Sequence, residues 1–442
     1  MFKIWRNTLV VFLILIIVNM EMVASTQILS KNQINNDDVA VCVSENTILN
    51  VGGSGSDNYS SIQYAINLSN DGDIVFVWAA SSPYFENIII DKKIFLIGEN
   101  KNNTIIDGRG IDTVLEIHHD GVTISGFTIK NSKKEWSNAG IVLFSDKNYI
   151  HDNIIMNTEN GIYSYGLEDT IIENNIISKC ENSGINISFS TNNTIKYNTF
   201  LNCDNFGIFT YDSLYNTVTD NFMNTVGVGV HLWYSFYNNI SKNSIINTNT
   251  GLSFKFYSKN NTIINNIIKD SIDCGIELNF SFFNSLKNNV VENTNVGYKL
   301  FYSNENYIEN NNIVSDCITG FDVIYSPDNI ISGNTIKNNS YGIKFFSSSG
   351  NVIEHNFILG NTEIGLFFTD MNKNNRIYYN DFISNTKNAF FTNSVSNHWN
   401  QNYWDDWAGI GFYMIDGVFT FSEKSFHIPW VNIDFSPRDN PY

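Results

Sequence analysis

Asparagine and aliphatic residues alternate along most of this chain in a pattern that returns every 22 to 24 residues. The stretch NCDNFGIFTYDSLYN, residues 202–216, is one copy, in which a glycine opens an aliphatic–aromatic alternation flanked by asparagines. An asparagine that precedes an aliphatic strand recurs in one phase at Asn153, Asn175, Asn198, Asn221, Asn243, Asn266, Asn289, Asn312, Asn334, Asn356 and Asn380. A fixed period of this length predicts a repeat architecture.

Two further marks keep the same phase. A glycine opens the next strand at Gly161, Gly184, Gly207, Gly229, Gly251, Gly275, Gly297, Gly320, Gly342 and Gly365, and Ala389 takes its place in the following copy. A second asparagine stands five residues before the first at Asn148, Asn193, Asn216, Asn238, Asn261, Asn284, Asn329, Asn351 and Asn375. The consensus N-x-I-x-x-N-x-I-x-x-(small)-x-x-x-G-I-x-I contains three short segments with the period-2 spacing of strands.

This period excludes several repeat folds and favours one. It is too short for ankyrin or tetratricopeptide repeats, and the LxxLxL pattern of leucine-rich repeats does not occur. Three short strands per repeat predict an all-β fold, a single-stranded right-handed parallel β-helix with 22–23 residues per coil. Successive coils stack at about 4.8 Å, so equivalent residues form rows along the axis, and about fourteen coils would span roughly 65 Å.

The rows give each repeated residue a role. Stacked asparagines can pair their amides along the axis, and the glycine row is expected to let the chain turn tightly into the next strand. A row of small residues contains Cys180, Cys203 and Cys317. Cys180 and Cys203 should lie one coil apart, either as a disulfide or as two buried free thiols. The five cysteines include no CxxC motif, which argues against a zinc ribbon.

The ends of the chain depart from the repeat. In SSIQYAINLS, Ser60 and Gln63 predict a capping box, and Ile62, Ala65 and Ile66 share one face of a short helix that would cap the first coil. The predicted organisation is listed by range: signal peptide 1–25, N-terminal linker 26–50, β-helix 51–395 and aromatic-rich C-terminal cap 396–442.

The first residues have the layout of an export signal. Lys3 and Arg6 precede an apolar run over residues 9–18, and the small residues Ala24 and Ser25 follow. An uncleaved N-terminal anchor is the alternative, although the run is shorter than the roughly 20 residues that span a bilayer. We therefore expect a secreted or cell-surface protein that contacts a membrane only through this segment, if it is retained. The formal net charge of −18 argues against nucleic acid as a partner.

The strand after each glycine directs alternate residues outward, and aromatic residues gather there in neighbouring copies. The candidate carbohydrate-binding residues are Tyr163, Tyr165, Phe209, Tyr211, His231 and Trp233. Exposed aromatic rings with polar edges suit the apolar faces of sugars. The alternative is that these rings pack on one another, because strands favour aromatic residues.

Charged residues occupy the same outward position in later copies. Glu277, Lys299, Asp322 and Lys344 alternate in sign along four successive coils, as expected for charges that pair across a sheet. Catalysis by this row is the alternative. Glycoside hydrolases use paired carboxylates, whereas this chain has Asp405–Asp406 only in the cap and no Gly-His-Gly motif. We assign no catalytic residue and leave enzymatic activity open.

No metal site is expected either. His118, His119 and Asp120 form the only histidine-rich spot, and a solvated turn accounts for it better than a metal site, which needs three or more converging ligands. No cofactor is assigned. Calcium held by carboxylates is the alternative.

These segments resemble a known family. ILNVGGSGSDNYSSIQYAINLSNDGDIVFVW, YFENIIIDKKIFLIGENKNNTIIDG, the asparagine–glycine repeats and NHWNQNYWDDW are similar to pectin-lyase-like right-handed parallel β-helix proteins, over about residues 48–407. Within them the chain looks most like the NosD-like proteins common on archaeal cell surfaces. The resemblance implies export and a role in surface or carbohydrate biology. The NosD name also implies copper handling, but the seven His and seven Met are scattered and form no Met-rich or paired-His site.

We therefore expect an exported cell-surface or envelope protein that binds a glycan or envelope polymer through the aromatic face. A polysaccharide-processing enzyme (lyase, hydrolase or epimerase) on the same face is the first alternative. A structural spacer, whose repeats provide length, is the second.

Overall fold

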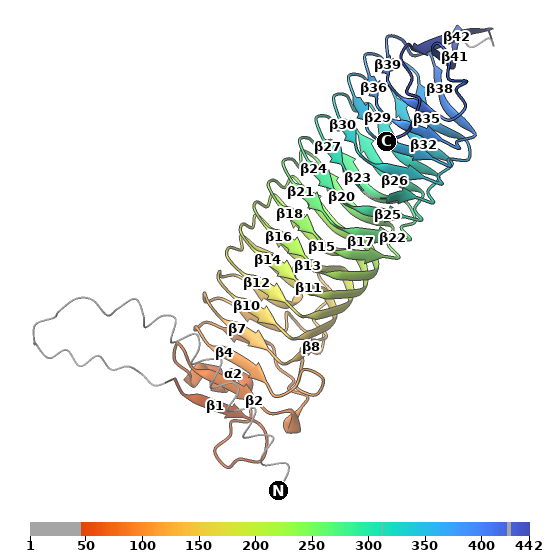
Figure 1. The fold of residues 1–442 in the computed structure, drawn as a ribbon. Helices are drawn as coiled ribbons and strands as arrows, with labels where there is room; N and C mark the ends of the chain where they lie inside the picture. Colours follow the sequence, from red (N-terminus) through yellow and green to blue (C-terminus); the bar gives the residue numbers. More distant parts are fainter. Residues whose placement is uncertain (1–45, 312, 422–425) are drawn as a thin grey trace, which may run out of the picture. The chain divides into compact units, whose positions relative to one another are not determined.

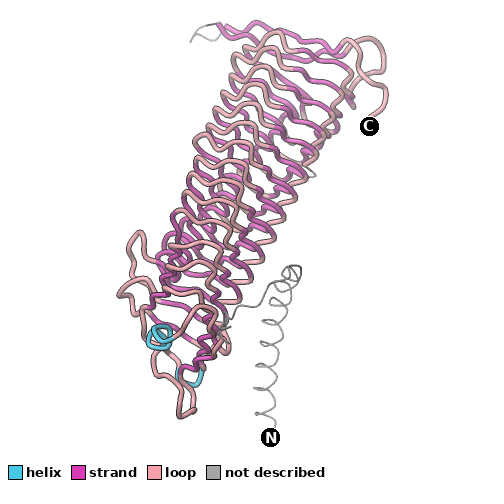
Figure 2. Tube along the Cα trace, turned by 90° about the vertical axis from the view of Figure 1, so that its left-hand side faces the viewer, coloured by secondary structure: helices cyan, strands magenta, loops and turns pink. Residues whose placement is uncertain are grey.

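The structure is a computed structural model that describes residues 46–311, 313–421 and 426–442. These residues form one compact unit of coils stacked along a common axis (Figure 1). The predicted signal peptide, and the part of the predicted linker up to residue 45, lie outside the described residues. The predicted all-β parallel β-helix is confirmed, and strands make up nearly all of its regular structure (Figure 2).

Three parallel ladders run along the stack. The first contains sixteen strands: β1 (Ile48–Val51), β2 (Ile74–Val77), β4 (Phe95–Gly98), β7 (Thr123–Ser125), β10 (Tyr149–His151), β12 (Ile171–Glu173), β14 (Thr194–Lys196), β16 (Thr217–Thr219), β18 (Asn239–Ser241), β21 (Thr262–Ile264), β24 (Ser285–Lys287), β27 (Tyr307–Glu309), β30 (Ile330–Ser332), β33 (Val352–Glu354), β36 (Arg376–Tyr378) and β39 (His398–Asn400). The stack is therefore longer than the fourteen coils expected, because the early coils are irregular in length and carry a weaker repeat signal.

The second and third ladders share four long strands that turn the corner between them: β11 (Ile154–Tyr165), β13 (Ile176–Ser188), β15 (Thr199–Tyr211) and β17 (Phe222–Trp233). The rest of the second ladder is β5 (Ile105–Asp107), β8 (Thr128–Lys130), β19 (Ser244–Ile246), β22 (Ile267–Lys269), β25 (Val290–Glu292), β28 (Ile313–Ser315), β31 (Thr335–Lys337), β34 (Phe357–Leu359), β37 (Asp381–Ile383) and β40 (Tyr403–Trp404). The rest of the third ladder is β3 (Ile88–Ile90), β6 (Leu115–Ile117), β9 (Ala139–Leu143), β20 (Thr250–Lys255), β23 (Cys274–Asn279), β26 (Val296–Phe301), β29 (Thr319–Ile324), β32 (Tyr341–Phe346), β35 (Ile364–Thr369), β38 (Lys387–Thr392) and β41 (Tyr413–Phe421).

Asparagine ladders inside the coils join each coil to the next. The amide nitrogen of Asn243 donates to the side-chain oxygen of Asn266 at 3.0 Å and to the backbone oxygen of Val218 at 2.9 Å. The backbone N–H of Asn243 donates to the same oxygen of Asn266 at 3.0 Å. The side-chain oxygen of Asn243 accepts from the backbone N–H and the side-chain nitrogen of Asn221, so every polar atom of the buried amide is used, which offsets the cost of burying it.

Two members of these ladders differ from the sequence prediction. Asn311 accepts from Asn289 at 3.1 Å and donates to Asn334 at 3.0 Å, the role predicted for Asn312, which lies outside the described residues. Asn306 belongs to the other asparagine ladder, where it lies between Asn284 and Asn329. Both differences arise because three consecutive asparagines, residues 310–312, leave the phase of this coil ambiguous by one residue.

The glycine row has a different physical reason from the one expected. Its members do not adopt the left-handed conformation, because none of Gly161 to Gly365 in the row is among the glycines with positive φ. A Cβ on Gly275 would lie 2.7 Å from the backbone oxygen of Gly297 and 2.3 Å from a methyl group of Val291. Close approach between neighbouring coils therefore requires glycine here.

The N-terminal helix α2 (Ile62–Leu68) buries Ile62, Ala65 and Ile66 as expected, but its capping differs from the prediction. The N-cap residue is Ser61 rather than Ser60, and its side chain accepts from the N–H of Tyr64. The Glu86 carboxylate accepts from the N–H groups of Ile62 and Gln63, each at 2.9 Å. A residue of the next coil thus replaces the local capping box, and its negative charge also suits the helix N-terminus.

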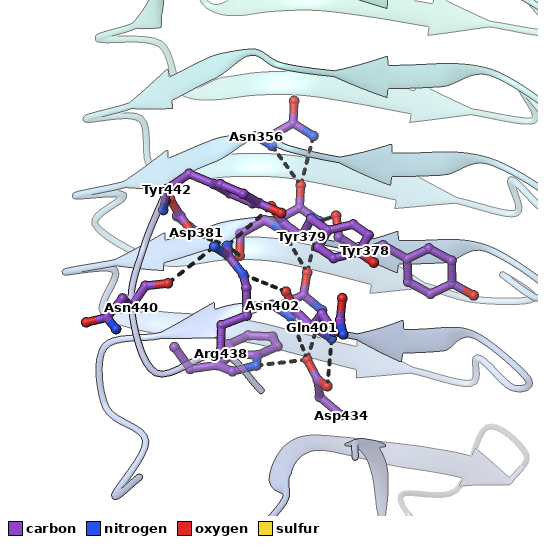
Figure 3. A network of polar contacts seen from close by, with 12 residues as sticks. Asn356, Tyr378, Tyr379, Asp381, Gln401, Asn402, Asp434, Arg438, Asn440 and Tyr442 are labelled. Carbon is purple, nitrogen blue, oxygen red and sulfur yellow. Dashed lines mark hydrogen bonds and ion pairs between the residues drawn. The ribbon is translucent and has the colours of Figure 1, made fainter. Parts of the chain in front are cut away.

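A buried carboxylate terminates the asparagine ladder at the other end of the stack (Figure 3). Strand β42 (Phe426–Asp434) pairs antiparallel with β41, and Asp434 at its end is fully buried. Its oxygens accept from the side chain of Asn402 at 3.0 Å and from the indole N–H of Trp404 at 3.2 Å. The last coil thereby receives the acceptor that a further asparagine would otherwise supply.

Candidate functional site

The six predicted aromatic-face residues lie on one sheet, in register. Strand pairing places Tyr163, Asn186, Phe209 and His231 in one row across β11, β13, β15 and β17. Tyr165, Ser188, Tyr211 and Trp233 form the second row. The prediction that these side chains share one face of neighbouring coils agrees with this register.

Their exposure is uneven. Tyr165, Tyr211 and Trp233 are 63%, 36% and 38% exposed, whereas His231 is 5% exposed. Tyr163 and Phe209 are half-buried. The second row therefore presents its rings to solvent. The buried His231 ring stacks on Phe209 in the first row, with ring centroids 5.6 Å apart, and meets Trp233 of the second row edge to face at 6.1 Å.

Rings that the sequence analysis did not include extend the face in both directions. Phe189 lies between Tyr165 and Tyr211, with ring centroids 4.6 and 5.2 Å away. The series continues from Trp233 to Phe256 at 4.8 Å, Phe280 at 6.4 Å, Tyr302 at 5.1 Å, Tyr325 at 4.9 Å and Phe346 at 5.3 Å. We call the nine residues Tyr165, Phe189, Tyr211, Trp233, Phe256, Phe280, Tyr302, Tyr325 and Phe346 the aromatic stripe.

Five stripe residues adopt a conformation that bulky side chains rarely take. Phe189, Phe256, Phe280, Tyr302 and Tyr325 follow the ends of their strands with φ between 47° and 53°. The same turn position is held by Asp212, Asp370 and Asn393 in other coils, also with positive φ. Asp and Asn suit this left-handed region, whereas an aromatic residue there is disfavoured. The backbone therefore does not explain the aromatic choice, and a ring at this position must serve contacts of the side chain.

The sequence does carry a signal for these residues. Each of them stands five positions after a repeat glycine, as does Tyr234. The alternation of outward residues along the strand does not include this position, because it lies one residue beyond the strand, in the turn.

The charged row lies beside the stripe, two or three residues before the stripe residue of the same coil. Glu277, Lys299, Asp322 and Lys344 are in register on β23, β26, β29 and β32. Glu277 pairs with Lys255 at 3.3 Å and accepts from the Ser253 hydroxyl at 3.2 Å. Burial raises the pKa of Asp322, an effect that Lys344 and Lys299 partly oppose. The row thus supplies alternating donors and acceptors along the stripe.

The two adjacent cysteines are free thiols in the interior. Cys180 and Cys203 are buried on β13 and β15, and the hydrogen bond between them lowers the pKa of Cys180 and raises that of Cys203. Of the two states expected from the sequence, the structure has the buried thiols.

The donors of the described residues do not fit a resident copper ion. They contain no group of three or more His, Cys, Asp or Glu side chains that could hold a metal ion. His118 contacts Glu116 at 3.1 Å, and His119 contacts the backbone oxygen of Asp120 at 2.8 Å. Within the same ranges, no helix is long and apolar enough to cross a membrane.

His231 should make stability depend on pH. Burial, helped by Lys255, lowers its pKa from about 6.5 to about 3. The unfolded chain therefore binds a proton between these values that the folded protein excludes, so acidification destabilises the fold. We expect His231→Phe, which keeps a ring against Phe209, to remove up to about 3 kcal/mol of the stability lost between pH 7 and pH 4. Chemical unfolding of both proteins at the two pH values measures this, and an equal loss in both would contradict it.

A family model described as "Periplasmic copper-binding protein (NosD)" matches residues 85–250 and 222–409. No curated protein matches the chain.

Solved structures with a similar arrangement include the periplasmic alginate epimerase AlgG, at 13% identity, covering 74% of this chain and 83% of its own, with a TM-score of 0.45. A family 28 exopolygalacturonase from Yersinia enterocolitica is 10% identical over 80% of this chain and 78% of its own, with a TM-score of 0.49. At such identities the likeness concerns the fold alone.

Proposed function

The chain belongs to the NosD family, and we propose that this member is an exported envelope or cell-surface β-helix protein that binds a glycan through the aromatic stripe. The family description is periplasmic, which supports a location outside the cytoplasm. The N-terminal segment, with its basic start and short apolar run, is consistent with export.

One observation carries the proposal. Seven of the nine stripe rings are between 36% and 63% exposed. Ring contacts join each to the next along the stack, except that Tyr211 and Trp233 are related by strand register alone. Contiguous exposed aromatic surface on a protein marks an interaction site. Tyrosine hydroxyls and the indole of Trp233 give these rings polar edges, which suit a ligand that is flat and apolar on one side and rich in hydroxyls at its edges.

The two rival functions predict different outcomes. A spacer does not require one aromatic residue in each of nine successive coils along the same edge of the sheet. An enzyme on the same face would release products from the glycan that it binds. Copper handling, which the family description names, is not part of the proposal, because the described donors do not converge.

Binding should depend on the rings of the exposed row. We expect Tyr211→Ala/Trp233→Ala to lose glycan-array binding by the secreted form, because the double change removes two adjacent exposed rings. Tyr197→Ala/Tyr307→Ala removes rings that are 54% and 44% exposed outside the stripe, and this control should bind as the parent does. Each of the two alanine substitutions in the stripe is expected to weaken glycan binding by about 1 kcal/mol or more.

A folded protein that binds no glycan in either form would contradict the proposal. The bound glycan, once found, can be incubated with the protein and its products separated by size. Shortened or unsaturated products would favour the enzyme, and an unchanged glycan would favour binding alone.

A further inference from the structure

We infer that the aromatic stripe is a track for a long, uncharged, linear polysaccharide whose chain lies parallel to the axis of the stack, with about one sugar ring per coil. This inference rests on the proposed function and names the class of glycan.

The length of the stripe points to a polymer. It places one ring in each of nine successive coils, from Tyr165 at the end of β11 to Phe346 at the end of β32. Coils repeat at about 4.8 Å, which is close to the length of one pyranose ring in an extended chain. A short oligosaccharide would use only part of this surface, whereas an extended chain in this direction meets a new ring at every sugar.

Turn residues extend the row of rings along the stack, beyond the coils of the original patch. The left-handed turn positions of Phe256, Phe280, Tyr302 and Tyr325 are each strained for an aromatic residue. They occur in four coils that lie beyond the original six-residue patch. Aromatic residues also take this conformation at turns outside the stripe, such as Tyr215, Tyr237 and Tyr379, so it is the unbroken row of rings that extends the site to these coils.

The charges beside the stripe select an uncharged partner. Glu277, Lys299, Asp322 and Lys344 sum to zero and alternate from coil to coil, so no two like charges are adjacent. Over the four coils that carry it, this row places hydrogen-bond acceptors and donors beside the rings. Within these four coils a polyanion would meet a carboxylate at every second coil, and the formal charge of −18 on the chain opposes its approach.

A peptide or a second copy of the chain fits the stripe less well. Buried cores of protein interfaces are apolar and fully desolvated, whereas this surface is a single row of rings bordered by charges. The charged side chains beside the stripe keep hydrogen-bond partners when the bound molecule supplies hydroxyl groups.

The test compares oligosaccharide length and charge. Isothermal titration of the full chain with uncharged β-1,4-linked gluco- and manno-oligosaccharides should give affinities that rise from trimer to hexamer to nonamer by roughly tenfold per step or more. Oligogalacturonates of the same lengths should bind more weakly at every length.

One double variant isolates the added part of the stripe. Phe280→Asn/Tyr302→Asn removes two rings and installs the residue that Asn393 shows at the same turn position, so the backbone should fold without strain. We expect the nonamer affinity to fall roughly tenfold or more while the thermal midpoint is kept. Tyr307→Ala, which removes an exposed ring from the first ladder, is the control and should leave the affinity unchanged.

The outcomes are distinguishable. An affinity that does not depend on length, or tighter binding of the charged oligomers, would overturn the track while leaving glycan binding intact. Loss of self-association in the double variant, with no effect on oligosaccharides, would identify the stripe as an interface between copies and overturn the inference. Absence of binding to every glycan would end both the inference and the proposed function.

Discussion

Gly275→Val is expected to prevent the central coils from stacking. The first added carbon would lie 2.3 Å from a methyl group of Val291 and 2.7 Å from the backbone oxygen of Gly297. Neither neighbour can withdraw, because Val291 is fully buried and the carbonyl belongs to the next coil. We expect a loss of about 4 kcal/mol in stability, at the upper end for overpacked cores.

Hydrogen exchange is the measurement of choice, because a stack of repeats opens locally rather than all at once. Exchange should accelerate in β20, β23 and β26 first. Ser285→Val provides the matched control, since it adds the same side chain on the outward face of β24, where Ile330 and Val352 already occupy equivalent positions. Equal exchange in both variants would show that the glycine row is not required for close packing.

The period of the coils could be predicted because each coil imposes the same demand on its sequence. A buried asparagine must give its hydrogens to one neighbour and receive them from the other, so Asn243 and Asn266 recur in phase. The glycine row follows from the close approach of carbonyls between coils, although its physical reason could not be read from the residue type alone. Glycine serves both left-handed turns and close contacts, and only the three-dimensional geometry separates these uses.

Features that depend on residues far apart in the sequence could not be predicted from it. Glu86 caps α2 from the following coil, so a local capping box was predicted in its place. Asp434 ends the asparagine ladder from a strand far along the chain from Asn402, and no local motif announces it.

The prediction of the candidate site was incomplete, because part of the site depends on the three-dimensional arrangement. Strand periodicity correctly places Tyr211 and Trp233 in adjacent coils of one face. It also treats His231 as one of the outward residues, although neighbouring rings bury it. The turn residues of the stripe escape this reasoning, since a left-handed residue reverses the direction of the side chain relative to the strand before it.

Asn289→Asp is the second change expected to have a large effect. The side-chain nitrogen of Asn289 donates to the backbone oxygen of Ile263 at 2.9 Å and to the side chain of Asn311 at 3.1 Å. In a carboxylate of the same shape, the oxygen that replaces this nitrogen would face both acceptors, and the buried charge would have no cationic partner. The loss should reach about 3–5 kcal/mol at neutral pH.

Protonation separates this mechanism from a general loss of packing. The buried carboxyl that Asn289→Asp introduces would have a folded-state pKa above its unfolded value, so stability should recover as the pH falls toward that unfolded value near about 4. Asn265→Asp, at an exposed turn with positive φ that suits Asp equally well, should be neutral at both pH values. If unfolding midpoints of Asn289→Asp at pH 7 and pH 5 differed no more than those of Asn265→Asp, the amide hydrogens would not be what holds neighbouring coils together. The stability of the stack would then reside in its aliphatic rows alone.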